Sequence, residues 1–214
     1  MLLLPSANAR ATEIKQMTGG RTAGKAITPA QESGASDMGG VVGLFVSPGI
    51  GQSMKACAEV RALAGRGLDG DRYATGQGSY SQAKRQVIRH VSIIEREAIE
   101  AANEELARRG LVPFEPNETR RNIVVEGADV YALLGREFSI GDVRLRGIEP
   151  TRPCHIPSAA ANKTGFKEAY SNRGGVRAEI LSDGIISVGD AISGDNISVL
   201  PRSRHVRLAP KADK

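Results

Sequence analysis

The chain has 214 residues, of which 40% are hydrophobic and only 4% aromatic, and its formal net charge is +5. This length favours a single domain with a substantial core, and so few aromatic side chains argue against a base-stacking surface for single-stranded nucleic acid. The charge is weak evidence for a nucleic-acid partner, because residues 39–201 are neutral overall and the excess lies at the two ends. We therefore expect no nucleic-acid partner.

Cysteine usage and hydropathy indicate the compartment. Cys57 and Cys154 are the cysteines of the sequence, too few for a disulfide framework in a chain of this length, and they suit a reducing compartment. No apolar stretch approaches the length of a membrane span, and the apolar run at residues 1–5 is too short for a signal peptide. The expectation is a soluble, cytoplasmic protein with no membrane partner.

The sequence divides into a leader, a domain and a tail. Residues 1–38 are rich in small and polar residues without sustained periodicity, which predicts a flexible or irregular leader. Residues 39–201 are expected to form the domain, and residues 202–214 a basic tail. A solvated tail is the simplest interpretation of that charge.

The first part of the domain alternates strands with polar loops. Residues 41–46 predict a buried strand, and residues 57–63 a half-buried strand in which Cys57 is structural. The glycine-rich residues 65–73 predict a loop where the backbone could approach a ligand, although the residues alone favour a simple surface turn. Residues 74–86 predict a long polar connection, a kind of segment that is often functional or mobile.

One helix stands out in the middle of the chain. Residues 95–109 follow a predicted strand at residues 90–94, and Ile99, Ala102 and Leu106 recur at helical spacing. Glutamates dominate its early turns and arginines its last turn, as the helix dipole favours. This apolar stripe predicts core packing rather than a binding surface.

Short strands with Gly-Asp turns dominate the rest of the domain. They predict a β-rich α+β fold, in the form of a barrel or sandwich. The predicted elements are a strand at 122–127, a helical turn at 129–134, a hairpin of 138–140 with 143–146, a short helix within 158–170, and a second hairpin of 176–181 with 185–188.

Cys154 is the most informative residue. Prolines at positions 150, 153 and 157 stiffen its loop. Arg152 and His155 flank the thiol with positive or potentially positive charge, and a thiol beside cations ionises more readily to the thiolate that attacks sulfur or binds metal. A buried, inert cysteine is an equally supported alternative from the local sequence alone.

The order of several motifs resembles the MOSC domain, the module named for the C-terminal domain of molybdenum cofactor sulfurases. The resemblance covers roughly residues 40–200, and it depends on the order and spacing of the motifs rather than on any single one. They are GLDGDR at 67–72, RNIVVEG at 121–127, GREFSIGD at 135–142, PTRPC at 150–154, GGVRAE at 174–179 and ISVGD at 186–190.

The resemblance implies a β-barrel with peripheral helices that binds a molybdenum or tungsten pterin cofactor. It also implies that Cys154 carries sulfur as a persulfide or ligates the metal. By its own chemistry His155 could lower the pKa of the thiol or shuttle a proton, and it could equally be a loop residue that points outward. The pyridoxal-phosphate domain of the long sulfurases has no counterpart in this sequence, so no pyridoxal phosphate is expected. No zinc site is expected, because the His and Cys residues lack zinc-ligand spacing.

An anionic cofactor requires fixed cations and backbone donors, and arginine forks match phosphate oxygens. Asn122 is a candidate for contact with the pterin edge, or else a structural residue at the start of a strand. The arginine candidates are Arg72, Arg120, Arg121 and Arg152, with Gly70 and Asp71 from the glycine-rich loop; Lys84, Arg85, Arg173 and Arg177 are weaker candidates.

Three functions stay open from the sequence. Cys154 could transfer sulfur, with a cysteine desulfurase as partner. It could instead hold the metal of a reductase for N-hydroxylated compounds, which would need a separate redox partner because the sequence shows no iron–sulfur or flavin motif. The third is a non-catalytic barrel that carries the cofactor or binds a protein, in which Cys154 would be dispensable.

Overall fold

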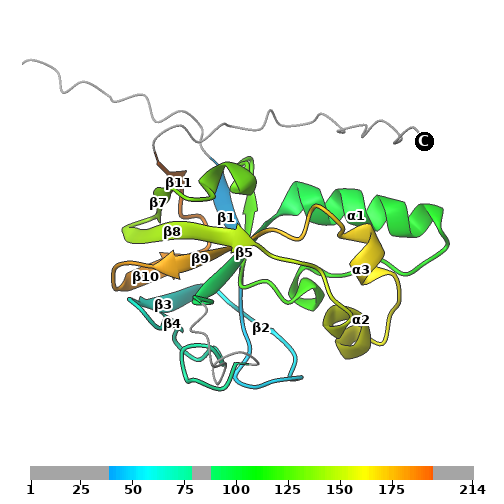
Figure 1. Cartoon of the computed structure of the whole chain (residues 1–214), viewed down its shortest axis with the longest axis horizontal. Coiled ribbons are helices and arrows are strands. Elements are labelled where there is room, and N and C mark those ends of the chain that lie inside the picture. The colour runs from blue at the N-terminus through cyan, green and yellow to red at the C-terminus, as the bar shows by residue number, and fades with distance from the viewer. Residues whose placement is uncertain (1–38, 79–87, 195–214) are drawn as a thin grey trace, which may run out of the picture. The chain divides into compact units, whose positions relative to one another are not determined.

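The computed structural model describes residues 39–78 and 88–194, and strands form most of its regular structure (Figure 1). Three helices, over residues 96–108, 156–161 and 166–169, gather together beside the strands. In chain order the elements are β1 (Gly40–Val46), β2 (Lys55–Cys57), β3 (Glu59–Leu63), β4 (Gly67–Leu68), β5 (Val91–Glu95), α1 (Arg96–Arg108), η1 (Pro116–Thr119), β6 (Ile123–Glu126), η2 (Val130–Leu133), β7 (Glu137–Ile140), β8 (Val143–Pro150), α2 (Ile156–Ala161), α3 (Phe166–Ala169), β9 (Val176–Ile180), β10 (Gly184–Ser187) and β11 (Ile192–Ser193).

An eight-stranded sheet in the order β11-β7-β8-β9-β5-β6-β1-β2 forms the scaffold. Its described pairs are antiparallel except β5 with β6, which are parallel. The sheet curls back on itself, because Gly40 of β1 bridges to Ala191 and the Ile192 amide donates to the Gly39 carbonyl at 2.9 Å. The predicted β-rich barrel with peripheral helices is thereby confirmed.

A second sheet has the order β10-β3-β4, and it corrects one prediction. The proposed hairpin of residues 176–181 with 185–188 is wrong, because β9 is occupied by β8 on one side and β5 on the other. β10 therefore leaves this sheet and pairs with β3, and the Asp183 carboxylate accepts a 2.7 Å hydrogen bond from the Ala64 amide beside that pair. The hairpin of β7 and β8 is confirmed.

The barrel interior is filled by the inward side chains of the strands. Alternation along β9 buries Val176, Ala178 and Ile180, and they join a cluster with the apolar residues of β5 and β8. Residues 57–63 divide into β2 and β3, and Cys57 packs half-buried against this cluster. The alternation therefore fixes which face of each strand points to the core.

A second apolar cluster holds the helices against the outside of the sheet. The α1 stripe is buried as predicted, with Ile99 at 3% exposure and Leu106 fully buried. Three rings complete this cluster: Phe166 stacks on Tyr170 at 4.0 Å between centroids, and Phe114 meets Phe166 edge-on at 5.1 Å. This cluster supports η1 and α2, which flank the cavity described below.

Some predictions fall on residues that the structure does not describe. Three predicted segments lie outside the described residues: the leader at 1–38, the tail at 202–214, and residues 79–86 of the connection at 74–86. The proposed domain limits therefore stay predictions. Within the described residues, none of the helices has the length and apolar character needed to cross a bilayer.

Candidate functional site

A cavity of about 510 Å³ opens between the carboxyl end of β8, the start of β6 and the loops after β1 and β4. Six of its lining residues are arginines, whereas Glu149 is the acidic residue among them. The lining residues are Ile50, Gly51, Arg72, Tyr73, Arg89, Val91, Ser92, Arg120, Arg121, Asn122, Glu149, Pro150, Thr151, Arg152, Pro153, Cys154, Ile156, Pro157 and Arg177.

Cys154 enters this cavity from the loop between β8 and α2. It is half-buried and free. The loop leaves the sheet at Thr151, whose amide donates to the Gly175 carbonyl at 2.7 Å. Gly174 packs so closely on Thr151 that an added Cβ would overlap the Thr151 carbonyl oxygen. A pair of glycines beside β9 therefore fixes the start of the cysteine loop.

Arg121 is the most deeply buried cation of the cavity, at 6% exposure. Its Nε donates to the Gly174 carbonyl at 2.7 Å and its Nη1 to the Thr119 carbonyl at 3.0 Å. Its Nη2 is buried and has no hydrogen-bond partner among the described residues, and the same holds for the hydroxyl of Thr151. Burial, followed by the charge of Arg177, lowers the pKa of Arg121 to about 10.

Arg120 has a left-handed backbone, with φ of +60°. A non-glycine residue in this region costs roughly 1 kcal/mol or more and often marks a functional site. Its Nη1 donates to the Gln52 carbonyl at 2.8 Å and so ties the loop after β1 to the start of β6. Burial lowers its pKa, with a further contribution from the charge of Arg72.

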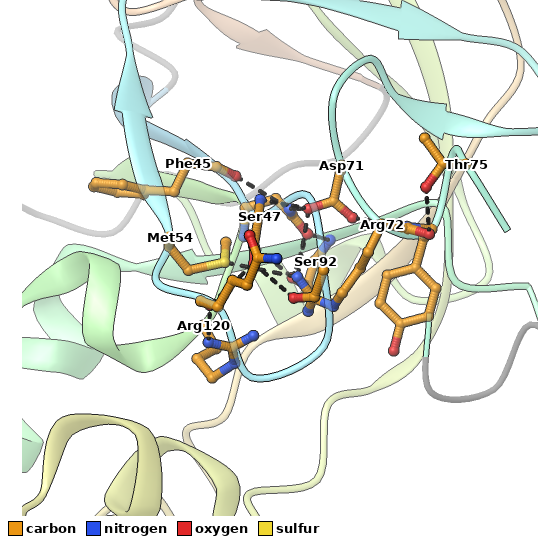
Figure 2. Close-up of polar contacts among 12 residues, drawn as sticks. Phe45, Ser47, Met54, Asp71, Arg72, Thr75, Ser92 and Arg120 are labelled. Carbon is orange, nitrogen blue, oxygen red and sulfur yellow. Dashed lines mark hydrogen bonds and ion pairs between the residues drawn. The ribbon is translucent and has the colours of Figure 1, made fainter. Parts of the chain in front are cut away.

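Asp71 organises the opposite wall from a fully buried position (Figure 2). Its carboxylate accepts hydrogen bonds from the Ser47 amide, the Asn122 side-chain amide and the Tyr73 amide, each at 3.1 Å. It also pairs with the Arg72 guanidinium at 3.5 Å. This carboxylate therefore holds together three segments that are distant in the sequence.

Asn122 is fully engaged by this network. Its Nδ2 donates to the Phe45 carbonyl and to Asp71, and its Oδ1 accepts from the Ser92 hydroxyl at 2.9 Å. The contact with a pterin edge that the sequence suggested is untested, and within the protein the amide positions β1, β5 and the Asp71 loop. Figure 2 shows Ser47, Ser92 and Arg72 converging on this centre.

The structure brings most of the predicted site residues together. Arg72, Arg120, Arg121, Asn122, Arg152 and Cys154 all line the cavity. Three others do not: Gly70, the buried Asp71, and His155, which is exposed at the start of α2. Their predicted roles in cofactor binding or catalysis stay predictions.

The weaker candidates divide in the same way. Arg177 lines the cavity and pairs with Glu149 at 2.9 Å, whereas Arg173 pairs with Glu105 at 3.6 Å and is not a lining residue. Lys84 and Arg85 lie outside the described residues. Sequence reasoning missed Thr151 as a site residue, although its position within the PTRPC motif was a usable signal.

The described residues hold no group of three or more His, Cys, Asp or Glu side chains that could bind a metal. The cavity offers a single thiol surrounded by guanidinium groups instead. Such a donor set suits an anionic molecule whose metal takes one soft sulfur ligand from the protein.

The comparisons with known proteins give the family. The family model described as "MOSC domain" matches residues 81–193. The chain belongs to the MOSC domain family. A comparison with curated protein sequences found no match.

Solved structures share the MOSC fold of this chain. The YuaD protein from Bacillus subtilis aligns with a TM-score of 0.58 and 20% identity over 72% of this chain and 94% of that one. YiiM from Escherichia coli aligns with a TM-score of 0.50 and 15% identity over 75% of this chain and 70% of that one. At these identities the likeness establishes the fold.

The MOSC family is associated with molybdenum cofactor binding, and the residues of this cavity fit such a group. The unpartnered Nη2 of Arg121 is a buried donor ready for an anion. Arg120 and Arg152 form no ion pair with a carboxylate within residues 39–78 and 88–194. Cys154 supplies the thiol in the same cavity.

Proposed function

We propose that the cavity binds a molybdenum or tungsten pterin cofactor with Cys154 as a thiolate ligand of the metal, and that the loaded protein reduces N-hydroxylated compounds. The observation that carries this proposal is the placement of Cys154. It is the only cysteine among the lining residues, and it shares the cavity with Arg121, whose buried Nη2 has no partner.

The arginines would hold the anionic part of the cofactor. A buried donor left without a partner costs about 1–3 kcal/mol, and a phosphate oxygen within reach of Nη2 would remove that cost at Arg121. An anion would also offset the burial of both guanidinium groups, the repulsion of Arg120 by Arg72 and the repulsion of Arg121 by Arg177, which lower their pKa values. Arg152, exposed at the same cavity, would add a weaker attraction.

Cys154 would hold the metal side of the cofactor. A thiolate is a soft ligand and needs neighbouring positive charge to be stable near neutral pH. Both Arg120 and Arg121 lie close enough to interact electrostatically with this thiol. The cations that would bind the cofactor therefore also surround its proposed sulfur ligand.

The reaction breaks the N–O bond of a hydroxylamine-type group. Two electrons and two protons convert R–NH–OH into R–NH₂ and water. A bound molybdenum cofactor supplies two-electron redox chemistry, and the electrons would come from a separate electron-transfer protein. The contribution of the chain is to bind and orient the cofactor and to leave space for the substrate beside Cys154.

Sulfur transfer is the second candidate, and the accessibility of the cysteine loop favours it. Arg152 and His155 on either side of Cys154 are exposed, so a cysteine desulfurase could reach the thiol. In this case a Cys154 persulfide would give up its outer sulfur and return to the thiolate. A barrel that only carries the cofactor is the non-catalytic alternative.

The test compares the two cysteines. Wild type, Cys154→Ser and Cys57→Ser are purified from molybdate-fed cells, molybdenum is measured by elemental analysis, and persulfide by mass spectrometry. Cys57 is a matched control because it is also a free, half-buried thiol but is not a lining residue. Reduction of an N-hydroxylated base is assayed with a supplied electron donor.

Metal ligation predicts bound molybdenum and reductase activity in wild type and in Cys57→Ser, with activity lost in Cys154→Ser. Persulfide on Cys154 without bound metal would favour sulfur transfer. Full cofactor binding and full activity in Cys154→Ser would contradict both roles of this thiol.

A further inference from the structure

The mouth of the cavity carries exposed aliphatic side chains. Five large hydrophobic residues are notably exposed in the described parts of the chain, namely Ile50, Val112, Ile156, Ile185 and Val188. Ile50 is 65% exposed and Ile156 is 40% exposed, and both line the cavity. A residue that both lines a cavity and faces solvent lies where the cavity opens.

The Ile50 side chain is exposed on a turn whose backbone is fixed by hydrogen bonds. The Gln52 amide donates to the Gly49 carbonyl at 3.3 Å, and the Ser47 hydroxyl is within hydrogen-bond distance of the Gly49 and Gln52 carbonyls. Arg120 donates to the same Gln52 carbonyl. The cation that lines the cavity therefore also fixes the turn that presents Ile50.

Ile156 is fixed from the other side. It is the first residue of α2 and follows Cys154 by two positions, and the adjacent Pro157 is buried. The Ser158 hydroxyl accepts a 3.3 Å hydrogen bond from the Phe166 amide, which joins α2 to α3 and its buried rings. Ile156 is therefore displayed beside the thiol by an anchored helix.

Isolated exposed aliphatic residues are ordinary on protein surfaces. Two that line one cavity, each on an anchored backbone, offer preorganised apolar surface. Arg120 and Arg121 are buried in the same cavity, whereas Ile50, Ile156 and Arg152 are exposed, so the mouth adds aliphatic surface to a site whose buried part is cationic. Such a division suits a substrate that directs a polar group inward and leaves an apolar group at the entrance.

We infer that Ile50 and Ile156 determine substrate specificity by contacting an apolar substituent of the N-hydroxylated substrate. This inference rests on the proposed function for the polar end of the substrate. It names a substrate class: compounds whose N-hydroxyl group is attached to an alkyl or similarly apolar group, in preference to small polar hydroxylamines.

The experiment measures binding by calorimetry and, separately, turnover by the reductase assay with a supplied electron donor. Acetamidoxime and hexanamidoxime are the probes, because they share the N-hydroxyamidine group and differ only in the length of the alkyl chain. Their dissociation constants are measured by calorimetry on protein purified from molybdate-fed cells, for wild type and for Ile50→Ser/Ile156→Ser. The matched control is Val112→Ser/Ile185→Ser, which removes two exposed aliphatic residues that do not line the cavity.

We expect wild type and the control variant to bind hexanamidoxime about 10-fold more tightly than acetamidoxime, and the Ile50/Ile156 variant to keep less than about a 3-fold preference. An equal preference in all three proteins, or no binding of either probe, would overturn the inference. Tight, chain-length-dependent binding without turnover would refute the reductase function while the apolar contact stands. Turnover without any dependence on Ile50 and Ile156 would refute the apolar contact while the reductase function stands.

Discussion

Two groups of arginines in this molecule have opposite surroundings. On the outer face of β7, β8 and β9, Glu137 pairs with Arg144 at 2.7 Å and with Arg146 at 2.6 Å. Arg146 also pairs with Glu179 at 3.4 Å, and the Arg144 and Arg146 side chains are largely exposed. These arginines form ion pairs with glutamates on the exposed surface, where each pair contributes little to stability.

In the cavity, Arg72 and Arg177 also pair with carboxylates, but Arg120 and Arg121 are bound through carbonyl groups instead. Arg121 donates to Gly174 and Thr119, and Arg120 donates to Gln52. These bonds fix the two guanidinium groups, neither of which forms an ion pair with a carboxylate of the described residues, and burial lowers the pKa of both. Holding cations in this state costs stability.

On the proposed function, the difference separates arginines paired on the surface from arginines available to a ligand. Arg120 and Arg121 also join distant segments through these bonds, but a fixed cation beside a thiol, without a paired carboxylate among the described residues, is what the proposed anionic cofactor would require. The following changes test whether the two groups differ as described, from the largest expected effect to the smallest.

Gly174→Ala should have the largest effect. Its new Cβ would overlap the Thr151 carbonyl oxygen, and the Gly174 carbonyl is the partner of Arg121 Nε. We expect a loss of about 3 kcal/mol in the free energy of unfolding, because the obstacle is backbone. Gly135→Ala, at a positive φ but in open space, should cost only about 1 kcal/mol. Equal denaturation midpoints for the two variants would show that the cavity wall is not tightly built.

Glu95→Gln extends the comparison to carboxylates. Burial raises the pKa of Glu95 from 4.5 to about 7, and its side chain accepts a hydrogen bond from the Val130 amide. Because the folded pKa is raised, the protonated form is favoured on folding, so stability declines as the pH rises from about 4.5 to about 7.

Between pH 5 and pH 8, the free energy of unfolding should fall by about 2 kcal/mol less in the Gln variant than in wild type, as measured by urea unfolding. Glu137→Gln is the control, because the arginine bonds lower the pKa of Glu137 and the side chain is exposed. A wild-type stability that is unchanged between the two pH values would contradict the burial of an ionisable Glu95.

Arg152→Gln should weaken cofactor binding only about 3-fold, because the side chain is exposed and screened. The loss should shrink further as salt is raised from low ionic strength. An Arg152 effect as large as that of removing a buried cavity arginine would mean that exposure does not set the strength of these contacts.

Arg144→Gln should have the smallest effect, below about 0.5 kcal/mol in the free energy of unfolding and none on cofactor content. Thermal unfolding monitored by circular dichroism measures the first, and elemental analysis the second. A loss of cofactor in this variant would remove the distinction between the two groups.

Periodicity made much of the fold predictable. The α1 stripe and the hairpin of β7 and β8 follow from spacings within one segment, and the structure has both. The partner of β10 was not predictable in this way, since β9 looked free in the sequence but both its edges are occupied in the sheet. Local patterns indicate elements, whereas strand pairing depends on segments far away in the chain.

The site shows the same division. The clustering of Arg120, Arg121, Arg152 and Cys154 followed from the order of the motifs. The carbonyl partners of the arginines lie as far as 53 or 68 residues away, and no local pattern signals them. Ile50 likewise sits in a turn without periodicity, so its place at the cavity mouth required the structure.

The most direct test measures pterin cofactor per chain in two double variants, by fluorescence of the oxidised pterin after purification from molybdate-fed cells. Arg120→Gln/Arg121→Gln removes two cavity cations, and Arg144→Gln/Arg146→Gln removes an equal charge from the outer face. Both are first checked for folding by circular dichroism. We predict that the cavity variant loses most of its cofactor while the outer-face variant matches wild type. Equal cofactor content in the two folded variants would contradict the assignment of the cavity arginines to an anionic cofactor.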